Sequence, residues 1–213
     1  VFIKSGEVHP VTDMVQGVSS GPVWSPDGTM IAFGAGPSPD EGLDPGKPYR
    51  VTRTVYRFDA IGYLDSTVED IYVITIEDGQ TRQLTNDGLM NRQPSWSPNG
   101  REILYEATMD PDRFDCIFPW LRIVDMNAQV RDILGEWGTG SDATWLPDGE
   151  RVAFIGRPNE DGWKNWSSKS DLWVVDTQGG QPECRTAGLD VGIGSILQPD
   201  LPNIMLVAKH QIL

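Results

Sequence analysis

The stretch "WSPDGTMIAF", residues 24–33, joins a tight turn to an apolar strand, and the chain uses it repeatedly. It returns as "WSPNGREILY" at 96–105 and as "WLPDGERVAF" at 145–154. A weaker copy, "LQPDLPNIML", stands at 197–206. Repetition of one short signature along a chain is typical of folds built from similar units placed next to each other.

The turn residues explain why each copy should form a hairpin. Pro26 presets the backbone at the second turn position, Asp27 suits the third, and Gly28 accepts the left-handed conformation that returns the chain to the next strand. The fourth copy carries Leu201 where this glycine belongs, so we expect it to be the least regular turn.

A second signature follows each turn, and it predicts another pair of strands. It reads "IYVITIEDGQTRQLT" at 71–85, "LRIVDMNAQVRDIL" at 121–134 and "LWVVDTQGGQPECRT" at 172–186. Four short antiparallel strands per unit, repeated in tandem, predict an all-β fold, a β-propeller of four-stranded blades. A β-sandwich also uses short strands and turns, but it gives no reason for the signatures to recur in register.

The repeats divide a single domain, residues 1–213, into blades. Three complete blades are expected at about 21–90, 91–140 and 141–190, flanked by half-blades at 1–20 and 191–213. The half-blades could meet and close a ring of four, or the chain could be an arc of a larger ring. We favour the arc, because the chain begins with Val1 rather than Met and opens inside a strand; we therefore expect a longer parent polypeptide.

Composition narrows the function classes. With 17 Lys and Arg against 31 Asp and Glu, the net charge is −14, which disfavours nucleic acid and anionic membranes as partners. No apolar run reaches the roughly 20 residues of a membrane span, and the start "VFIKSGEVHP" lacks a signal-peptide pattern. Cys116 and Cys184 have no metal-ligand spacing, so we expect two buried thiols and no cofactor.

The connections between the second and third strands of each blade are long. They run over residues 36–70, 108–120 and 157–171, and strand parity places all three on one face, opposite the tight turns. Long loops in compact domains are usually functional. They also contain aromatic residues among acidic ones, which is typical of an interface, although the same rings could simply pack their own loops. These residues are Phe114, Phe118, Trp120, Trp163 and Trp166.

One part of the chain resembles a known family. "RTVYRFDAIGYLDSTVEDIYVITIEDGQTRQLTNDG", residues 53–88, followed by "QPSWSPNGREILY", resembles the N-terminal propeller of the prolyl oligopeptidase family, in its acylaminoacyl-peptidase and dipeptidyl-aminopeptidase-like branch. The turn motif alone is also similar to the TolB propeller. The peptidase resemblance implies a seven-bladed ring over an α/β-hydrolase domain, which carries the catalytic Ser-Asp-His and receives short peptides through the propeller.

No catalytic residues are predicted within the chain itself. The closest approach to a Gly-x-Ser-x-Gly nucleophile turn is "VGIGSILQ", where Ser195 has Ile193 and Leu197 at the glycine positions. The only histidines, His9 and His210, fall in the two half-blades, so no Ser–His pair is evident.

Acidic loops offer weak candidates for cations. The loop "DPDRFD" offers Asp110, Asp112 and Asp115, but it lacks the glycine and the distant glutamate of a calcium loop. The loop "PSPDEGLDPG" offers Asp40, Glu41 and Asp44. We interpret both as solvated loops and predict no metal site.

The segment "YRFD" supplies the sharper site hypothesis. Alternation puts Arg57 and Asp59 on one side of a strand, where they could pair with each other or contact a hydrolase domain or a peptide terminus. The candidate contact residues, most of them carried by the resemblance, are Tyr56, Arg57, Asp59, Tyr63, Trp120, Trp163 and Trp166.

Two functions remain open at this level. The first is a non-catalytic propeller that gates and orients peptides for the hydrolase domain of a cytoplasmic serine peptidase, with that domain and the peptides as partners. The second is a free-standing TolB-like propeller, periplasmic, that binds proteins through its loop-rich face. Whether the protein as a whole is an enzyme depends on residues outside this sequence.

Overall fold

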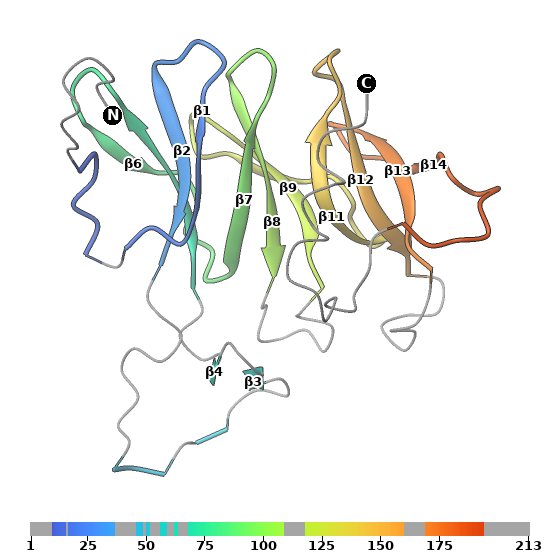
Figure 1. Ribbon diagram of the computed structural model, residues 1–213, viewed down its shortest axis with the longest axis horizontal. Coiled ribbons are helices and arrows are strands. Elements are labelled where there is room, and N and C mark those ends of the chain that lie inside the picture. The colour runs from blue at the N-terminus through green and yellow to red at the C-terminus, as the bar shows by residue number, and fades with distance from the viewer. Residues whose placement is uncertain are drawn as a thin grey trace.

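Three four-stranded antiparallel sheets stand side by side in the computed structural model, which describes residues 10–15, 17–36, 46–48, 50, 51, 56–58, 62, 63, 68–108, 118–159 and 169–193 (Figure 1). Each sheet is one repeat of the sequence, and its strands pair in the order β1-β2-β5-β6, β7-β8-β9-β10 and β11-β12-β13-β14. This confirms the all-β fold with four-stranded antiparallel blades, which we name blades 1, 2 and 3.

The strands are short, as propeller blades require. Blade 1 comprises β1 (Ser20–Trp24), β2 (Met30–Ala35), β5 (Asp70–Thr75) and β6 (Thr81–Gln83). Blade 2 comprises β7 (Met90–Trp96), β8 (Glu102–Thr108), β9 (Trp120–Asp125) and β10 (Val130–Asp132). Blade 3 comprises β11 (Gly138–Trp145), β12 (Arg151–Pro158), β13 (Asp171–Asp176) and β14 (Glu183–Cys184).

The first strand of blade 3 begins earlier than the boundary near residue 141 that the sequence suggested. β11 already pairs with β12 from Gly138, and a bulge between Ser141 and Thr144 separates this early part from the part that carries Trp145. The bulge interrupts the regular alternation of side chains between these two parts of the strand.

The turns have the predicted chemistry. The φ angle is 72° at Gly28, 69° at Gly100 and 69° at Gly149, a region that favours glycine. In the first turn the Ser25 hydroxyl donates to Asp27 Oδ1 at 2.7 Å and accepts the Met30 amide at 2.9 Å. Two side chains thus hold the turn in addition to its backbone bonds.

Apolar side chains fill the spaces between blades. Successive residues of β8 face opposite sides, so that Ile103 packs with blade 1 and Leu104 packs with blade 3. Both side chains are at most 1% exposed. Blade 2 is therefore a layer covered on two faces, and most of the described core lies at the two interfaces between the blades.

In blades 2 and 3 the tryptophan that opens the turn also joins its blade to the preceding one. Trp96 Nε1 donates to the carbonyl oxygen of Val23 at 3.0 Å. Trp145 Nε1 donates to the carbonyl oxygen of Ser95, also at 3.0 Å. Val23 and Ser95 are equivalent residues, because each immediately precedes the tryptophan of its own blade. The same bond thus recurs at both interfaces.

Some predictions concern residues that the structure describes only in part, and one prediction about a cysteine is wrong. The half-blades expected at 1–20 and 191–213 lie mostly outside the described residues, as does Cys116. Cys184 is partly exposed on the outer strand β14, so the prediction of a buried thiol is wrong for this residue. Within the described ranges, no helix is long and apolar enough to cross a membrane.

The turn glycines give a direct stability test. A β-carbon at Gly100 would meet only the Pro26 ring, at 3.6 Å, so Gly100→Ala adds backbone strain at φ 69° without a clash. We expect the free energy of unfolding to fall by about 1–2 kcal/mol, measured by urea denaturation. Gly188→Ala is the control, because Gly188 has no positive φ and no atom within 4 Å of an added β-carbon. Equal effects of the two changes would contradict the turn assignment.

Candidate interaction face

The strand ends from which the long insertions leave lie on one side of the molecule. β2, β8 and β12 all end on the lower side in Figure 1, and β5, β9 and β13 all begin there. The tight turns lie on the opposite side. The predicted separation of long and short connections is therefore confirmed for the strand ends, and we call the lower side the insertion face.

Part of the first insertion forms a small hairpin of its own. β3 (Arg57–Phe58) pairs with β4 (Gly62–Tyr63), with Arg57 opposite Tyr63, below the blades in Figure 1. Tyr56 is 40% exposed and Arg57 is also exposed. This element was predicted only as one strand, because its pairing partner shows no alternation.

Four other aromatic or charged residues of the insertions fall outside the residues that the structure describes. Asp59, Phe114, Trp163 and Trp166 lie outside the described residues, so the proposed pairing of Arg57 with Asp59 stays a prediction.

Trp120 requires a correction. It was a candidate contact residue, but its side chain is 4% exposed and packs in the cluster between blades 1 and 2. The Arg122 guanidinium lies 5.5 Å from the centre of its ring. Trp120 opens strand β9 and points into an interface between blades, so it is a core residue without a surface for a partner.

Phe118 behaves in a similar way. It is half-buried, and the Arg157 guanidinium lies 4.5 Å from its ring centre. Burial lowers the pKa of Arg157 from its usual value. For Phe118 and Trp120, the interpretation that the insertion aromatics pack their own surroundings describes the structure.

A buried polar cluster closes the insertion-face end of blade 1. Asp70 accepts hydrogen bonds from Thr85 Oγ1 at 2.8 Å and Gln83 Nε2 at 3.0 Å. Asn91 Nδ2 donates to Thr85 Oγ1 at 3.2 Å and to Asp87 Oδ1 at 2.8 Å. Thr85 Oγ1 in turn accepts the amide at the start of β5. The cluster thus fixes both the third strand and the connection into blade 2.

Blade 3 has the same threonine–aspartate hydrogen bond, but the pKa of its aspartate is shifted in the opposite direction. Asp171 accepts from Thr186 Oγ1 at 2.7 Å and pairs with Lys169 Nζ at 3.0 Å. Burial alone would raise the pKa of Asp171, but the bonds from Thr186 and Lys169 outweigh it and lower the pKa. Burial raises the pKa of Asp70, and the nearby Asp87 carboxylate adds to that shift. The two equivalent carboxyls therefore differ because Asp70 is the more deeply buried and only Asp171 has a cation beside it.

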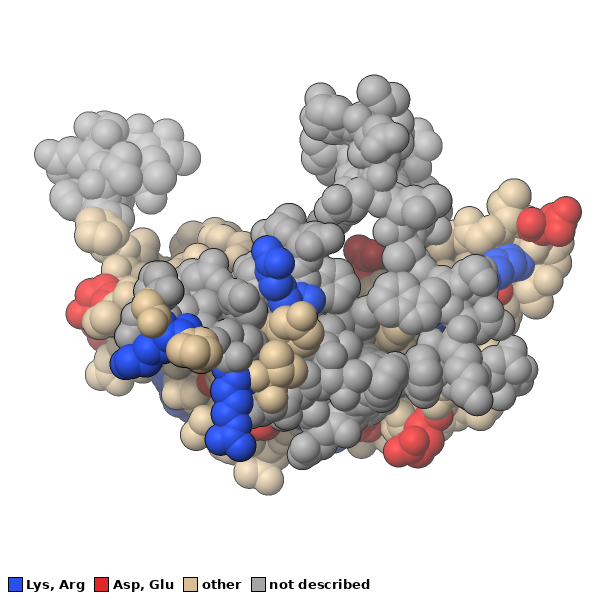
Figure 2. All heavy atoms as spheres, turned by 90° about the horizontal axis from the view of Figure 1, so that it is seen from below, with Lys and Arg blue, Asp and Glu red and all other residues tan. Residues whose placement is uncertain are grey.

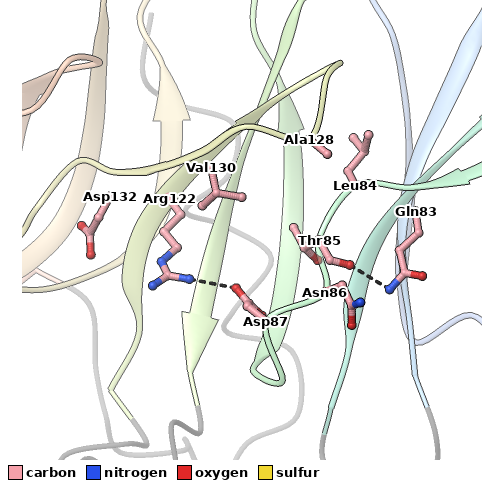
Figure 3. A pocket seen from close by; sticks show the side chains of 9 residues that line it. All are labelled: Gln83, Leu84, Thr85, Asn86, Asp87, Arg122, Ala128, Val130 and Asp132. Carbon is pink, nitrogen blue, oxygen red and sulfur yellow. Dashed lines mark hydrogen bonds and ion pairs between the residues drawn. The ribbon is translucent and has the colours of Figure 1, made fainter.

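A groove of ≈590 Å³ lies between the outer parts of blades 1 and 2 (Figure 3). Gln83, Thr85 and Asp87 line one side, and Arg122 with Asp132 lines the other. Arg122 Nη1 donates to Asp87 Oδ2 at 2.8 Å across the groove. The single guanidinium is thus already matched by carboxylates, so the groove offers no strong attraction to an anion.

Glu69, just before β5, and Glu106, in β8, have interactions that the sequence did not reveal. Glu69 is 3% exposed and accepts hydrogen bonds from the Ser19 hydroxyl and from Arg92 Nε. Glu106 Oε1 accepts the backbone amide of Asp142 at 2.8 Å, which links blade 2 to the bulge of blade 3. The only sequence signal for Glu106 is a charged residue inside the apolar strand "EILYEAT".

The environment of Glu106 favours its neutral form. Burial raises the pKa of its carboxyl to about 7, the Asp142 amide opposes that shift, and the Asp142 charge adds to it. Asp142 itself has a φ of 50°, which directs its amide toward the neighbouring blade.

Neither a metal centre nor a hydrolytic centre is assembled by the described residues. Within them, no group of three or more His, Cys, Asp or Glu side chains could hold a metal ion. Both histidines, Ser195 and the two acidic loops considered as cation sites lie outside the description.

The chain is similar in sequence to one curated protein that is named as a peptidase. No family model matches the chain. The chain is 27% identical over 205 residues to a protein of Bacillus subtilis (strain 168) named as the uncharacterized peptidase YuxL. That alignment covers 92% of this chain and 31% of the relative, so the chain spans about a third of the relative's length.

Two solved structures carry the structural likeness. Acylaminoacyl peptidase from Pyrococcus horikoshii matches with a TM-score of 0.59 at 14% identity, over 84% of this chain and 26% of that one. A TolB-like protein from Agrobacterium tumefaciens matches with a TM-score of 0.52 at 19% identity, over 82% and 50% of the two chains. These likenesses establish the β-propeller fold, and they include both groups that the sequence resembles.

The raised pKa of Glu106 predicts a pH-dependent stability. The native state holds the Glu106 proton more tightly than the unfolded chain, whose carboxyl has a pKa near 4.5. Stability is therefore lost as pH rises from about 4.5 to about 7. We expect Glu106→Gln to remove about 1–2 kcal/mol of that loss, less than the full shift implies because the carboxyl is partly exposed.

Urea unfolding at pH 5 and pH 8 measures this effect. Glu77→Gln, at an exposed position in the turn after β5, is the control. If wild type and Glu106→Gln changed in parallel between the two pH values, the assignment of a buried neutral carboxyl would be wrong.

Proposed function

We propose that this chain is the non-catalytic propeller of a serine peptidase similar to the acylaminoacyl and prolyl oligopeptidases. In this proposal the propeller gates and orients peptide substrates for a hydrolase domain that lies outside this sequence. The observation that carries the proposal is the match, over 92% of the chain, to a protein named as an uncharacterized peptidase.

The two faces of the propeller differ in a way that supports this role: one has short turns and the other has long insertions. A rigid set of packed blades with minimal turns on one side leaves the insertion face to make specific contacts. Figure 2 shows that face, where Lys and Arg side chains of the described residues gather toward the blade 1 side. In a chain of net charge −14, such a concentration of cations is suited to a carboxylate partner.

The first insertion is the source of a basic stretch. Residues 46–58, "GKPYRVTRTVYRF", contain four Lys or Arg residues and no Asp or Glu. We propose that Arg57, with Tyr56 and Tyr63, contacts either the acidic surface of the hydrolase domain or the carboxylate of a peptide. Asp59, Trp163 and Trp166 remain part of the same proposed contact surface.

A second candidate function is a TolB-like module that binds proteins through the insertion face. The structural match to a TolB-like protein, which covers half of that chain, favours it. The two functions imply different locations, the cytoplasm for the peptidase and the periplasm for the TolB-like module. A parent reading frame that contains a Gly-x-Ser-x-Gly motif with a later Asp and His supports the first; one without these residues supports the second.

The chain by itself should be inactive as a peptidase. We expect no turnover of acylated or short peptide substrates by the purified 213-residue chain, because the proposed catalytic groups lie elsewhere. Activity that co-purifies with the chain through two independent separations would overturn the non-catalytic role.

Arg57 provides the sharper test in the full-length protein. Arg57→Ala should lower kcat/KM for peptides by about threefold or more, in line with the loss of a partly exposed ion pair. Arg101→Ala is the matched control, because Arg101 is exposed on the side of the tight turns. Unchanged kinetics and unchanged domain association for Arg57→Ala would exclude the contact.

A further inference from the structure

The first strands of the three blades form the inner side of the molecule. β7 lies next to both β1 and β11, whereas the outer strands β6, β10 and β14 make no comparable contact with one another. Each first strand is also at the end of its sheet. Because the blades converge at these strands, their free edges face the centre, and we call this surface of β1, β7 and β11 the inner wall.

A bulge interrupts each first strand at the same place. In β7 the register of the pairing shifts between Arg92 and Ser95. In β11 it shifts between Ser141 and Thr144, and β1 has an equivalent shift after Ser20. Bulges often re-aim a side chain next to a functional site. The inner wall therefore has one such position in each blade.

Two of the three bulges contain a strained residue. Gln93 and Asp142 each stand three residues before the turn tryptophan of their blade, and their φ angles are 57° and 50°. This left-handed conformation is unfavourable for any residue other than glycine, and blade 1 has Gly21 at this position. Both side chains are exposed. Strain of this kind, retained where glycine would relieve it, clusters at sites that use the side chain.

A glutamate of the preceding blade contacts each of these bulges. Glu106 Oε1 of blade 2 accepts the amide of Asp142 at 2.8 Å, so it bonds to the strained residue itself. Glu69 of blade 1 accepts a hydrogen bond from Arg92 Nε, and Arg92 directly precedes Gln93. Each bulge is therefore braced by a carboxyl group from outside its own sheet.

The two glutamates reach similar places from different positions in the sequence. Gly34 in β2 is the residue equivalent to Glu106 in β8, because each comes ten residues after its turn tryptophan. A β-carbon on Gly34 would lie 2.9 Å from Glu69 Oε1. Blade 1 thus has no side chain at the position of Glu106, and the carboxylate of Glu69 occupies that space instead. The recurrence of one chemical group from two sources indicates that the bulges of the inner wall depend on it.

We propose that Gln93 and Asp142 contact the main chain of a bound peptide, and that Glu69 and Glu106 are positioning residues that hold the two bulges. The inference rests on the proposed function, in which the propeller gates and orients peptides. The carboxamide of Gln93 both donates and accepts hydrogen bonds, and the carboxylate of Asp142 accepts them. Together they suit the alternating N–H and C=O groups of a peptide, whatever its side chains.

Glycine substitutions test the two contacts. In the 213-residue chain, Gln93→Gly and Asp142→Gly should raise the equilibrium constant of unfolding by less than twofold, because relief of strain offsets the greater freedom of glycine in the unfolded chain. In the full-length protein, each should raise KM for short peptides about threefold or more, with kcat unchanged, since the contact is made before and during reaction. The increase should be similar for peptides that differ in their side chains.

Ala128→Gly is the matched control. Ala128 also has a positive φ, 62°, but it lies in the turn between β9 and β10, away from the inner wall. The substitution should relieve similar strain and leave KM unchanged.

Two substitutions of Glu106 test the positioning role. Glu106→Gln keeps an oxygen that accepts the Asp142 amide, whereas Glu106→Leu removes it. Glu106→Leu should therefore speed hydrogen exchange of the Asp142 amide in the 213-residue chain and raise KM of the full-length protein as Asp142→Gly does. Glu106→Gln should retain the wild-type KM. Faster exchange in Glu106→Leu with an unchanged KM would overturn the positioning role.

The outcomes separate this inference from the proposed function. A full-length wild-type protein without peptidase activity would overturn the proposed function and this inference with it. An active enzyme with the same KM in wild type, Gln93→Gly and Asp142→Gly would overturn this inference alone. So would glycine variants that are strongly destabilised, because the side chains would then serve the fold, and so would an equal rise of KM in Ala128→Gly.

Discussion

Each blade of this protein is tied to its neighbour by the residues that also form its own tight turn. The tryptophan before the turn donates to the preceding blade, at 3.0 Å in both described interfaces, and the glycine within the turn receives the preceding proline. A single five-residue motif therefore specifies the local hairpin and the spacing between layers. Because the bond needs a carbonyl at one position of the preceding first strand, it also fixes the relative height of adjacent blades.

This constraint explains where the chain tolerates variation. The side with the tight turns cannot lengthen without moving the tryptophan or the proline away from its partner. At the opposite ends of the strands the repeated contact between blades is a backbone bond, from the Asn91 amide to the Glu69 carbonyl oxygen at 2.8 Å and from the Gly140 amide to the Pro119 carbonyl oxygen at 2.9 Å. Such a bond requires no particular side chain, and the insertions of different length end just before it. Side chains on the insertion face therefore differ between blades. Asp70 and Asp171 occupy equivalent positions, but the pKa of Asp70 is raised and the pKa of Asp171 is lowered.

The features that could be predicted from the sequence are those determined within a few residues. The turn at 25–28 is one, because proline and glycine limit the backbone locally and Asp27 bonds within the turn. The burial of Trp120 could not be predicted in this way, because Trp120 is buried in a cluster with Ala32 and Ile71, which belong to another blade. Glu106 could be noticed as a charge within an apolar strand, but its partner is an amide that only the bulge at Asp142 makes available. The contact role of Arg57 stays a prediction.

Blade 2 shows how the insertion face can diverge at little cost. In blades 1 and 3 a threonine at the end of the fourth strand bonds to an aspartate at the start of the third, at 2.8 and 2.7 Å. The equivalent residues of blade 2 are Leu134 and Trp120, both 4% exposed and packed in apolar clusters. Replacing one partner alone would leave a buried polar group unsatisfied, at about 1–3 kcal/mol, whereas replacing both by apolar residues avoids that cost. Paired exchange of this kind lets each blade present a different edge to the insertions while the tryptophan bonds on the other side keep the layers in place.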